Sequence, residues 1–434
     1  MRSHQDNALG LYLSIPFCRS KCTYCNFASG VYPASGHARY VDRLIEDMAA
    51  AGEWSARMGL ELPRTVDTVY LGGGTPSLLA PELLEQLFSA MRAQFDLVPD
   101  AEITIECAPG QLADATLEAF RAVGVNRVSL GVQSFIDREA QVSGRLHSRA
   151  VVERDLARLR TAGIANLNVD LIAGLAGQTL AFWEDSLTAL IDSGAPHASV
   201  YMLEVDEDSR LGREMLAGGA RYYAELVPTD DAIAQMYTRA IERLALAGLE
   251  QYEISNFCRP GFASRHNLRY WQRRPYLGLG LDASSMALHA ADSSLPGVGS
   301  LEPRYVLRWT TTSDLAEFLA GPEPVETAWL SPARQYEEAW FLGLRLNRGV
   351  EVAALVREFG REPAARAMEV VERLAGDGLL ASDGRTVRLT ALGQLLSNDV
   401  FQEFLGLDAG EHPAEAAPGP RQGMLHGDSG RRAR

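Results

Sequence analysis

The first half of the chain alternates short apolar runs with longer amphipathic stretches. Six apolar runs are typical of buried β-strands: 11–16, 66–71, 103–107, 127–132, 167–172 and 198–203. Six stretches with a helical period lie after these runs: 38–58, 81–95, 114–123, 148–161, 180–193 and 229–248. Strict alternation of strand and helix indicates a parallel sheet covered by helices. The right-handed crossover rule leaves two arrangements, a doubly wound sheet or a β/α barrel.

Polar residues just past the ends of these runs favour the barrel. They are the cysteine cluster at 18–25, the glycine-rich loop 72–76, Glu106, Gln133, Asp170 and Glu204. A β/α barrel brings the carboxyl ends of all its strands to one mouth, whereas a doubly wound sheet spreads them along a crevice. We therefore predict an α/β fold built on a partial (β/α)6 TIM-type barrel.

The character of the sequence changes after about residue 290. Helical patterns over 335–346, 352–358 and 364–376 precede two short strands around Asp383-Gly384, a hairpin turn signal, and a final helix. This order predicts a C-terminal helical, winged-helix-like domain. We predict a barrel domain at 1–288, the C-terminal domain at 289–406 and a disordered tail at 407–434, which is rich in Ala, Gly, Pro and charge.

Composition narrows the classes of protein that remain. The 434 residues include 47% hydrophobic ones, enough to fill a large core, and carry a formal net charge of −15. That acidity disfavours nucleic acid as a partner. The N-terminus has no apolar signal region, and no apolar stretch approaches the ~20 residues of a membrane span. We predict a cytoplasmic protein without an integral membrane segment, in a compartment where thiols stay reduced.

Three of the five cysteines fall within eight residues. Cys18, Cys22 and Cys25 form a C-x3-C-x2-C pattern, and soft thiolate ligands select zinc, copper or iron–sulfur centres. A structural zinc site needs a fourth nearby ligand, which Asn26 and Phe27 do not supply. Three thiolates suit a four-iron cluster with one iron open to an exogenous ligand. Zinc and three unliganded thiols remain the alternatives.

This chain resembles the radical S-adenosylmethionine (SAM) superfamily, specifically its coproporphyrinogen-oxidase-like branch. The resemblance rests on YLSIPFCRSKCTYCNF, YLGGGTPSLL, TIECAPG, GVNRVSLGVQSF, NVDLIAGLAGQT, YEISNFCRPGFASRHNLRYW and YLGLGLDASS, between residue 12 and about 285. It implies a 4Fe-4S cluster on Cys18, Cys22 and Cys25, with SAM on the open iron. The resemblance also implies SAM-binding residues, which are Tyr12, Gly73, Gly74, Thr75, Glu106, Gln133, Arg145 and Asp170. Of these, Gln133, Arg145 and Asp170 match positions that bind a second SAM molecule in the oxidase. A structural ion pair between Arg145 and Asp170 is the alternative for the last two.

The resemblance also implies a second set of residues, which would bind heme. SRHNLRYW carries His266, Asn267, Tyr270 and Trp271, which match the HNxxYW motif of the HemW family of heme chaperones. On sequence alone, a lone histidine such as His266 is most often structural. Aromatic side chains within one helical turn of an imidazole could flank a flat macrocycle, so we give these four residues a tentative heme role.

Two features separate the chaperones of this branch from its oxidases. Phe27 stands where the oxidase carries a further cysteine, and only about ten residues precede the first strand, where the oxidase has an extension. We therefore expect a heme chaperone that delivers heme to an unknown acceptor protein and takes electrons for its cluster from a donor. The alternative is an oxygen-independent coproporphyrinogen III oxidase of porphyrin biosynthesis, so enzymatic activity stays open. RNA modification is disfavoured by the acidic charge.

The chain also departs from the chaperone pattern. LGLGLDASS replaces LGLGAGAHS, which puts Leu281, Asp282 and Ser284 where small residues and a histidine are usual. Ala176 replaces a proline, and Cys258 an alanine. The missing histidine puts a heme contact at that loop in doubt.

Overall fold

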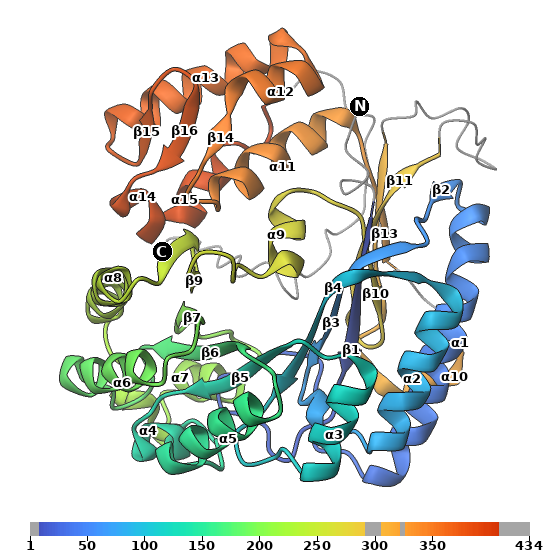
Figure 1. The fold of residues 1–434 in the computed structure, drawn as a ribbon. Coiled ribbons are helices and arrows are strands. Elements are labelled where there is room, and N and C mark those ends of the chain that lie inside the picture. The colour runs from blue at the N-terminus through green and yellow to red at the C-terminus, as the bar shows by residue number, and fades with distance from the viewer. Residues whose placement is uncertain (1–7, 291–304, 322–325, 408–434) are drawn as a thin grey trace.

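The computed structural model describes residues 8–290, 305–321 and 326–407. All six predicted strands form, run parallel and neighbour one another in chain order (Figure 1). They are β1 (Leu9–Ile15), β3 (Thr65–Gly73), β4 (Asp96–Cys107), β5 (Arg127–Gln133), β6 (Asn166–Ala173) and β7 (His197–Met202). The predicted α/β fold with a partial barrel is confirmed, because each of these strands pairs in parallel with the next.

The six predicted helices also form, within one or two residues of the expected bounds. They are α1 (His37–Arg57), α2 (Pro81–Gln94), α3 (Asp114–Val123), α5 (Arg149–Thr161), α6 (Leu180–Asp192) and α8 (Asp230–Leu246). Their apolar faces join the outward-facing side chains of the strands in one large core. Among the described residues, none of the helices has both the length and the hydropathy needed to cross a membrane.

The sheet extends further than six strands at both edges. Beside β1 lies a seventh parallel strand, β10 (Tyr276–Leu279), followed by antiparallel β11 (Ser284–His289), β12 (Val306–Thr310) and β13 (Glu326–Leu330). Beside β7 lie antiparallel β9 (Asn256–Cys258) and β8 (Glu250–Glu253), and the two-residue strand β2 (Leu60–Glu61) pairs with β11. The described strand order begins at β13 and ends at β8, so the barrel is open.

The two faces of the parallel strands differ in chemistry. In β6, Leu167, Val169 and Leu171 are fully buried in the core beneath the helices. Asn168 and Asp170 alternate with them and point to the concave face, where their partners are polar side chains of neighbouring strands. A TIM barrel normally fills its interior with branched apolar residues. A polar interior instead leaves groups that can bind a polar ligand.

The C-terminal part has its own hydrophobic core and contains the three helices and the hairpin that were predicted, with one further strand and a second final helix. Its elements are α11 (Pro332–Leu344), β14 (Val350–Glu351), α12 (Val352–Phe359), α13 (Arg361–Gly376), β15 (Leu380–Ser382), β16 (Thr386–Leu389), α14 (Ala391–Leu395) and α15 (Ser397–Gln402). The three short strands form an antiparallel sheet in the order β14-β16-β15. The predicted boundary at 288 stays a prediction, since the large sheet itself continues to β13. The tail predicted from 407 lies, beyond its first residue, outside the described residues.

Shorter elements connect these units. They are η1 (Ala34–Gly36), η2 (Pro76–Leu78), α4 (Asp137–Val142), α7 (Arg210–Leu216), η3 (Arg221–Leu226), α9 (Arg265–Trp271) and α10 (Leu315–Ala320). Helix α9 matters most for the site, because it lies on the concave face of the sheet, opposite α1, α2 and α3 (Figure 1).

Candidate functional site at the barrel mouth

The cysteine cluster lies on a loop that leaves the carboxyl end of β1. The loop is closed by two backbone hydrogen bonds, from Cys18 N to Gly30 O at 2.9 Å and from Gly30 N to Pro16 O at 2.8 Å. Its far side rests on the segment after α4, where Thr23 N donates to Ser143 O at 3.1 Å. A loop tied down at both ends presents its side chains in fixed directions.

The three thiols share one neighbourhood with hydroxyl groups around them. Burial raises the pKa of the Cys18 thiol, and the nearby Cys25 and Cys22 raise it further. Thr75 Oγ1 lies 3.9 Å from Cys18 Sγ, and Ser29 Oγ lies 4.0 Å from Cys25 Sγ. All three cysteines are unbridged, so their sulfurs remain available as ligands.

In the described part of the chain, no three His, Cys, Asp or Glu side chains are arranged to hold a single metal ion. A four-iron cluster makes a different demand, because each thiolate binds its own iron and the sulfurs need not converge on one point. Three soft donors on a tied loop, flanked by hydroxyls, fit such a cluster in their chemistry.

The glycine-rich loop after β3 packs directly against the cysteine loop. Gly74 N donates to Ile15 O and Thr75 N to Phe17 O, both at 2.8 Å. A Cβ at Gly74 would lie 2.8 Å from backbone atoms of Ile15 and Phe17, and Gly73 has a φ of +99°. Glycine is therefore required at both positions for the two loops to touch.

Glu106 closes the β4 side of the same corner. Tyr70 Oη donates to Glu106 Oε1 at 2.8 Å, and the ring of Tyr70 stacks on that of Tyr12 with centroids 6.1 Å apart. Burial raises the pKa of Glu106 to about 7, and the nearby Asp170 charge adds to the rise. Such a carboxyl group gains from a positively charged ligand, since a cation favours its ionised form.

Gln133 and Arg145 carry buried polar atoms without a partner. Gln133 Oε1 and Arg145 Nε are both covered and make no hydrogen bond to any residue that the structure describes. Gln133 has a φ of +69° at an irregularity between β5 and β6, and Arg145 packs over Gly131, where a Cβ would clash with its guanidinium. A buried polar atom without a hydrogen bond lowers the stability of the fold, and such atoms at the mouth of a barrel are typical of a site that binds a polar ligand. These residues therefore fit SAM, a ligand with ammonium, carboxylate and ribose groups.

Asp170 extends the mouth toward β6 and β7. Ser129 Oγ donates to Asp170 Oδ2 at 3.1 Å, and Asn168 Nδ2 donates to Oδ1 at 2.7 Å. Burial raises the pKa of Asp170, while these hydrogen bonds and the Arg127 guanidinium oppose the rise. Within the described residues Arg145 and Asp170 form no ion pair, although Arg145 lies in the field of that carboxylate. The two are therefore neighbours at a mouth rather than a bonded pair.

The structure thus brings together, at one mouth, the residues that the sequence predicts for the cluster and for SAM. Sequence reasoning missed three others on the inner face: Tyr70, which holds Glu106, and Arg127 and Ser129, which flank Asp170. The signal was present in the strict alternation of apolar and polar residues in each strand, which marks the inward-facing positions.

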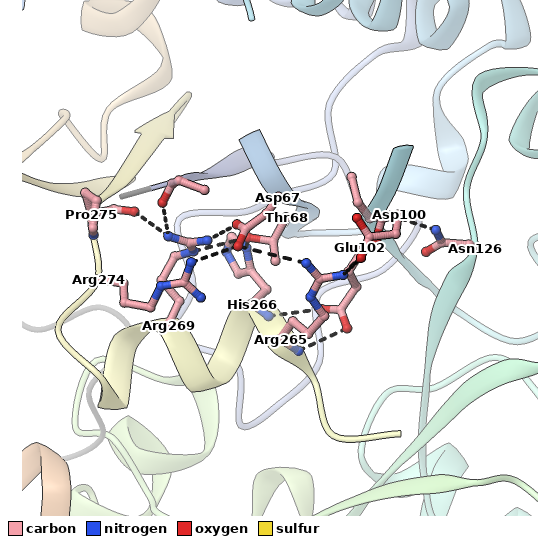
Figure 2. A network of polar contacts seen from close by, with 12 residues as sticks. Asp67, Thr68, Asp100, Glu102, Asn126, Arg265, His266, Arg269, Arg274 and Pro275 are labelled. Carbon is pink, nitrogen blue, oxygen red and sulfur yellow. Dashed lines mark hydrogen bonds and ion pairs between the residues drawn. The ribbon is translucent and has the colours of Figure 1, made fainter. Parts of the chain in front are cut away.

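The residues predicted for heme lie on α9, deeper inside the barrel. Figure 2 shows Asp67 and Thr68 of β3 and Glu102 of β4 facing this helix. His266 is fully buried, and both of its ring nitrogens have a partner, Thr68 Oγ1 and Tyr270 Oη, each at 2.9 Å. Burial lowers the pKa of His266 well below its ordinary value, so the ring is neutral.

A charge network fixes α9 to the sheet (Figure 2). Arg269, fully buried, pairs with Asp67, and Arg274 Nη2 reaches the same carboxylate at 2.8 Å. Glu102 accepts hydrogen bonds at 3.0 Å from the backbone nitrogens of Arg265 and His266, at the N-terminus of the helix. An acidic group at that end is favoured by the helix dipole.

Asn267 lies near the N-terminus of α9, and Trp271 is the last residue of the helix. Asn267 N binds Ser264 Oγ at 3.3 Å in the N-cap of α9. Trp271 lies under the guanidinium of Arg345 from the C-terminal domain, 4.4 Å from its ring centroid. The rings of Tyr70 and His266 are 5.3 Å apart, so Tyr70 is a direct contact between the mouth and α9.

The positions where this chain departs from the chaperone pattern lie in well-packed surroundings. Leu281 N donates to Tyr40 Oη at 3.0 Å, and Ser284 Oγ lies 2.9 Å from Thr310 Oγ1. Asp282 has a φ of +52°, and burial raises its pKa to about 6. This loop therefore has a structural role of its own.

Comparisons with known proteins agree with this geometry. Residues 12–190 match the sequence model of the Radical SAM superfamily, and residues 330–396 match that of the HemN C-terminal domain. The heme chaperone HemW of Lactococcus lactis is 32% identical over 394 residues, which cover 91% of this chain and 96% of the relative. HemW of Mycobacterium tuberculosis is 34% identical over 403 residues, which cover 92% of this chain and 95% of the relative.

A solved structure has the same fold. The coproporphyrinogen III oxidase HemN from Escherichia coli superposes with a TM-score of 0.75 over 92% of this chain and 90% of that chain. The two sequences are 21% identical, so this likeness speaks for the architecture alone.

Proposed function

We propose that this chain, which belongs to the radical SAM superfamily and within it to the HemW family, binds heme and passes it to an acceptor protein. The observation that carries the proposal is the similarity to proteins named heme chaperone HemW, at 32% to 35% identity over most of both chains. Phe27, 42% exposed beside Cys25, stands where the oxidases of this branch carry a further cysteine.

The mouth of the barrel supports a cluster and SAM as part of this function. Cys18, Cys22 and Cys25 would hold a 4Fe-4S cluster, and such a cluster supplies one-electron chemistry to a bound SAM. Glu106, with its raised pKa, suits the ammonium group of that ligand. The loop at 73–75 would place backbone groups against it, because glycine leaves no Cβ in the way.

The remaining SAM residues would orient polar parts of the ligand. Gln133 Oε1 and Arg145 Nε supply one acceptor and one donor, both unpaired and covered. Asp170 supplies a carboxylate held by two hydrogen bonds. Tyr12 lines the wall next to Tyr70.

A heme role for His266 requires a change at α9. One of its ring nitrogens would have to give up its partner, Thr68 or Tyr270, to bind iron, and its complete burial would have to be relieved. We therefore propose that heme uptake through His266, with Asn267, Tyr270 and Trp271 around it, is accompanied by release of α9 from the sheet.

The test is anaerobic reconstitution of the cluster, followed by heme titration and a coproporphyrinogen III turnover assay on the same protein. We expect stoichiometric heme binding, heme transfer to an apo-hemoprotein and no decarboxylation. Cys22→Ser should lose iron and brown absorbance while the far-ultraviolet circular dichroism stays unchanged. Cys258→Ser, a buried cysteine away from the cluster loop, is the matched control and should keep both.

Three results would overturn these assignments. Formation of protoporphyrinogen with consumption of SAM would make the chain an oxidase instead of a chaperone. A Cys22→Ser protein that retains four irons would remove this residue from the ligand set. Heme binding unchanged in His266→Ala would leave a chaperone whose heme ligand lies elsewhere.

A further inference from the structure

The interior of the barrel contains a line of hydrogen bonds that leads from Asp170 at the mouth to the N-terminus of α9. We propose that His197 is a positioning residue in this line, and that it couples the occupancy of the SAM site to the seating of α9. The inference rests on the proposed function, since it concerns regulation of the helix that carries the tentative heme residues.

The strand register brings the middle of the line together. Ser129 of β5 lies opposite Asn168 of β6, and Asn168 lies opposite His197 of β7. All three side chains are at most 2% exposed. Polar groups buried so completely must bond to one another, so their orientations are fixed by their partners.

The direction of each hydrogen bond follows from Asp170. A carboxylate only accepts, so the amide nitrogen of Asn168 must face it, at 2.7 Å. The amide oxygen of Asn168 then faces His197 Nδ1, at 2.6 Å. An oxygen acceptor requires a donor opposite, so His197 carries its proton on Nδ1.

The other side of the imidazole continues the line. Burial lowers the pKa of His197 well below its ordinary value, so the ring is neutral and its Nε2 is an acceptor. Tyr252 Oη lies 3.0 Å from that nitrogen and donates to it. The same oxygen accepts a hydrogen bond from Ser264 N at 3.2 Å.

Ser264 is the N-cap of α9, so the line ends on the helix itself. Its Oγ accepts from Asn267 N at 3.3 Å and lies 3.4 Å from Glu102 Oε1. From Ser264 N through Tyr252 and His197, every donor points toward Asp170. Such a chain polarises in one direction, and each bond strengthens the next.

A ligand that engages Asp170 changes the first acceptor of this chain. The change reaches the N-cap of α9 because no group between them can rotate without losing a hydrogen bond of the line. Coupling between two binding events is reciprocal, so whatever seats α9 also strengthens binding at Asp170. Through this line, bound SAM would keep α9 packed against the sheet, and loss of SAM would weaken that packing.

The experiment uses the full chain with its cluster reconstituted and kept oxidised, so that SAM binds without being cleaved. Hydrogen exchange of the α9 amides is measured with and without SAM, and SAM affinity is measured by calorimetry. Tyr252→Phe removes one oxygen atom and cuts the line without leaving a cavity. Tyr237→Phe is the matched control, because it removes the same oxygen atom from a tyrosine whose hydroxyl bonds to Gln251 and Ile254 outside the line.

We expect SAM to slow exchange across α9 in the wild type and in Tyr237→Phe, and to have no such effect in Tyr252→Phe. SAM affinity should fall about fivefold in Tyr252→Phe, the factor that corresponds to one neutral hydrogen bond. An α9 that responds equally in Tyr252→Phe, or that ignores SAM in the wild type, would overturn the inference. Heme titration reports separately on the chaperone function, since a chain that shows the SAM response but takes up no heme refutes only the latter.

Discussion

Glu106 shows at the scale of one residue how a ligand site opposes stability. Its pKa of about 7 in the fold, against an ordinary value near 4.5, means that the ionised form is disfavoured by folding. Below pH 4.5 the group is protonated in both states and costs nothing. As the pH rises to 7 the unfolded state gives up its proton first, so the free energy of unfolding falls over this window.

Glu106→Gln should therefore be more stable than the wild type above pH 7, by about 2 kcal/mol after allowance for partial solvent access. The amide keeps an oxygen for Tyr70, so the difference isolates the charge. Urea unfolding of the cluster-free protein at pH 4 and pH 8 measures it. Equal stability of the two proteins at pH 8 would show that folding does not disfavour the ionised carboxyl group.

The same variant should bind SAM less tightly, because it lacks the carboxylate that would meet the ammonium group of SAM.

The residues of the site differ in how far the sequence reveals them. The cysteine spacing and the GGGTP loop are local in sequence, so Cys18 and Gly73 can be assigned from the sequence alone. Tyr270 is a local partner of His266, but its other two partners are not, because Thr68 and Glu102 lie 198 and 164 positions away in the chain. Nothing in SRHNLRYW itself indicates that both imidazole nitrogens are paired within the fold.

At the scale of elements, the seat of α9 depends on a glycine in a distant strand. Gly10 of β1 lies beneath Arg269, and a Cβ there would overlap the arginine side chain. Arg269 cannot move aside, because its guanidinium also binds Ala8 O at 2.7 Å and Pro275 O at 2.9 Å, and it pairs with Asp67. The absence of a side chain at Gly10 is what allows the helix to enter the barrel.

Gly10→Ala should lower the free energy of unfolding by about 2 kcal/mol, the usual cost of overpacking a rigid site. Exchange of the α9 amides should rise more than exchange elsewhere. The matched control is Gly52→Ala in α1, where a Cβ meets nothing within 4 Å. That change should stabilise the protein by about 0.5 kcal/mol, because alanine favours a helix over glycine. Chemical denaturation of both variants measures these changes. A Gly10→Ala protein with the free energy of unfolding of the wild type would show that Arg269 does not need the space above Gly10.

The elements that could be predicted are those with long, regular patterns. In strands such as β5 and β6, and in the helix between them, the pattern of apolar and polar residues repeats often enough to predict the element. The strands that extend the sheet have at most six residues: β10 has four, one of them a glycine, and β11 begins only at the end of LGLGLDASS. Their pairing depends on edges supplied by β1 and β7, which no local pattern encodes.

At the scale of the whole molecule, one buried arginine joins the barrel to the C-terminal domain. Arg345 follows α11, is 8% exposed, and lies over the ring of Trp271 at the end of α9. Its charge faces Glu253 of β8, which is fully buried. A backbone hydrogen bond also connects the two parts, because Ile254 N donates to Arg345 O at 3.2 Å. The C-terminal domain is thus in contact with the same helix that the barrel interior holds at its other end.

Replacing Arg345 tests whether its charge stabilises the contact between the barrel and the C-terminal domain. Arg345→Met should lower the free energy of unfolding by about 2 kcal/mol, because the Arg345 charge favours the ionised form of the buried Glu253 carboxylate. Glu253→Gln in the same chain should recover much of that loss, which gives a coupling energy of about 2 kcal/mol between the two positions. Urea unfolding of the wild type, both single variants and the double variant completes the cycle. If the two losses simply add, the guanidinium acts through its stacking on Trp271 instead, and Trp271→Leu should then reproduce the effect of Arg345→Met.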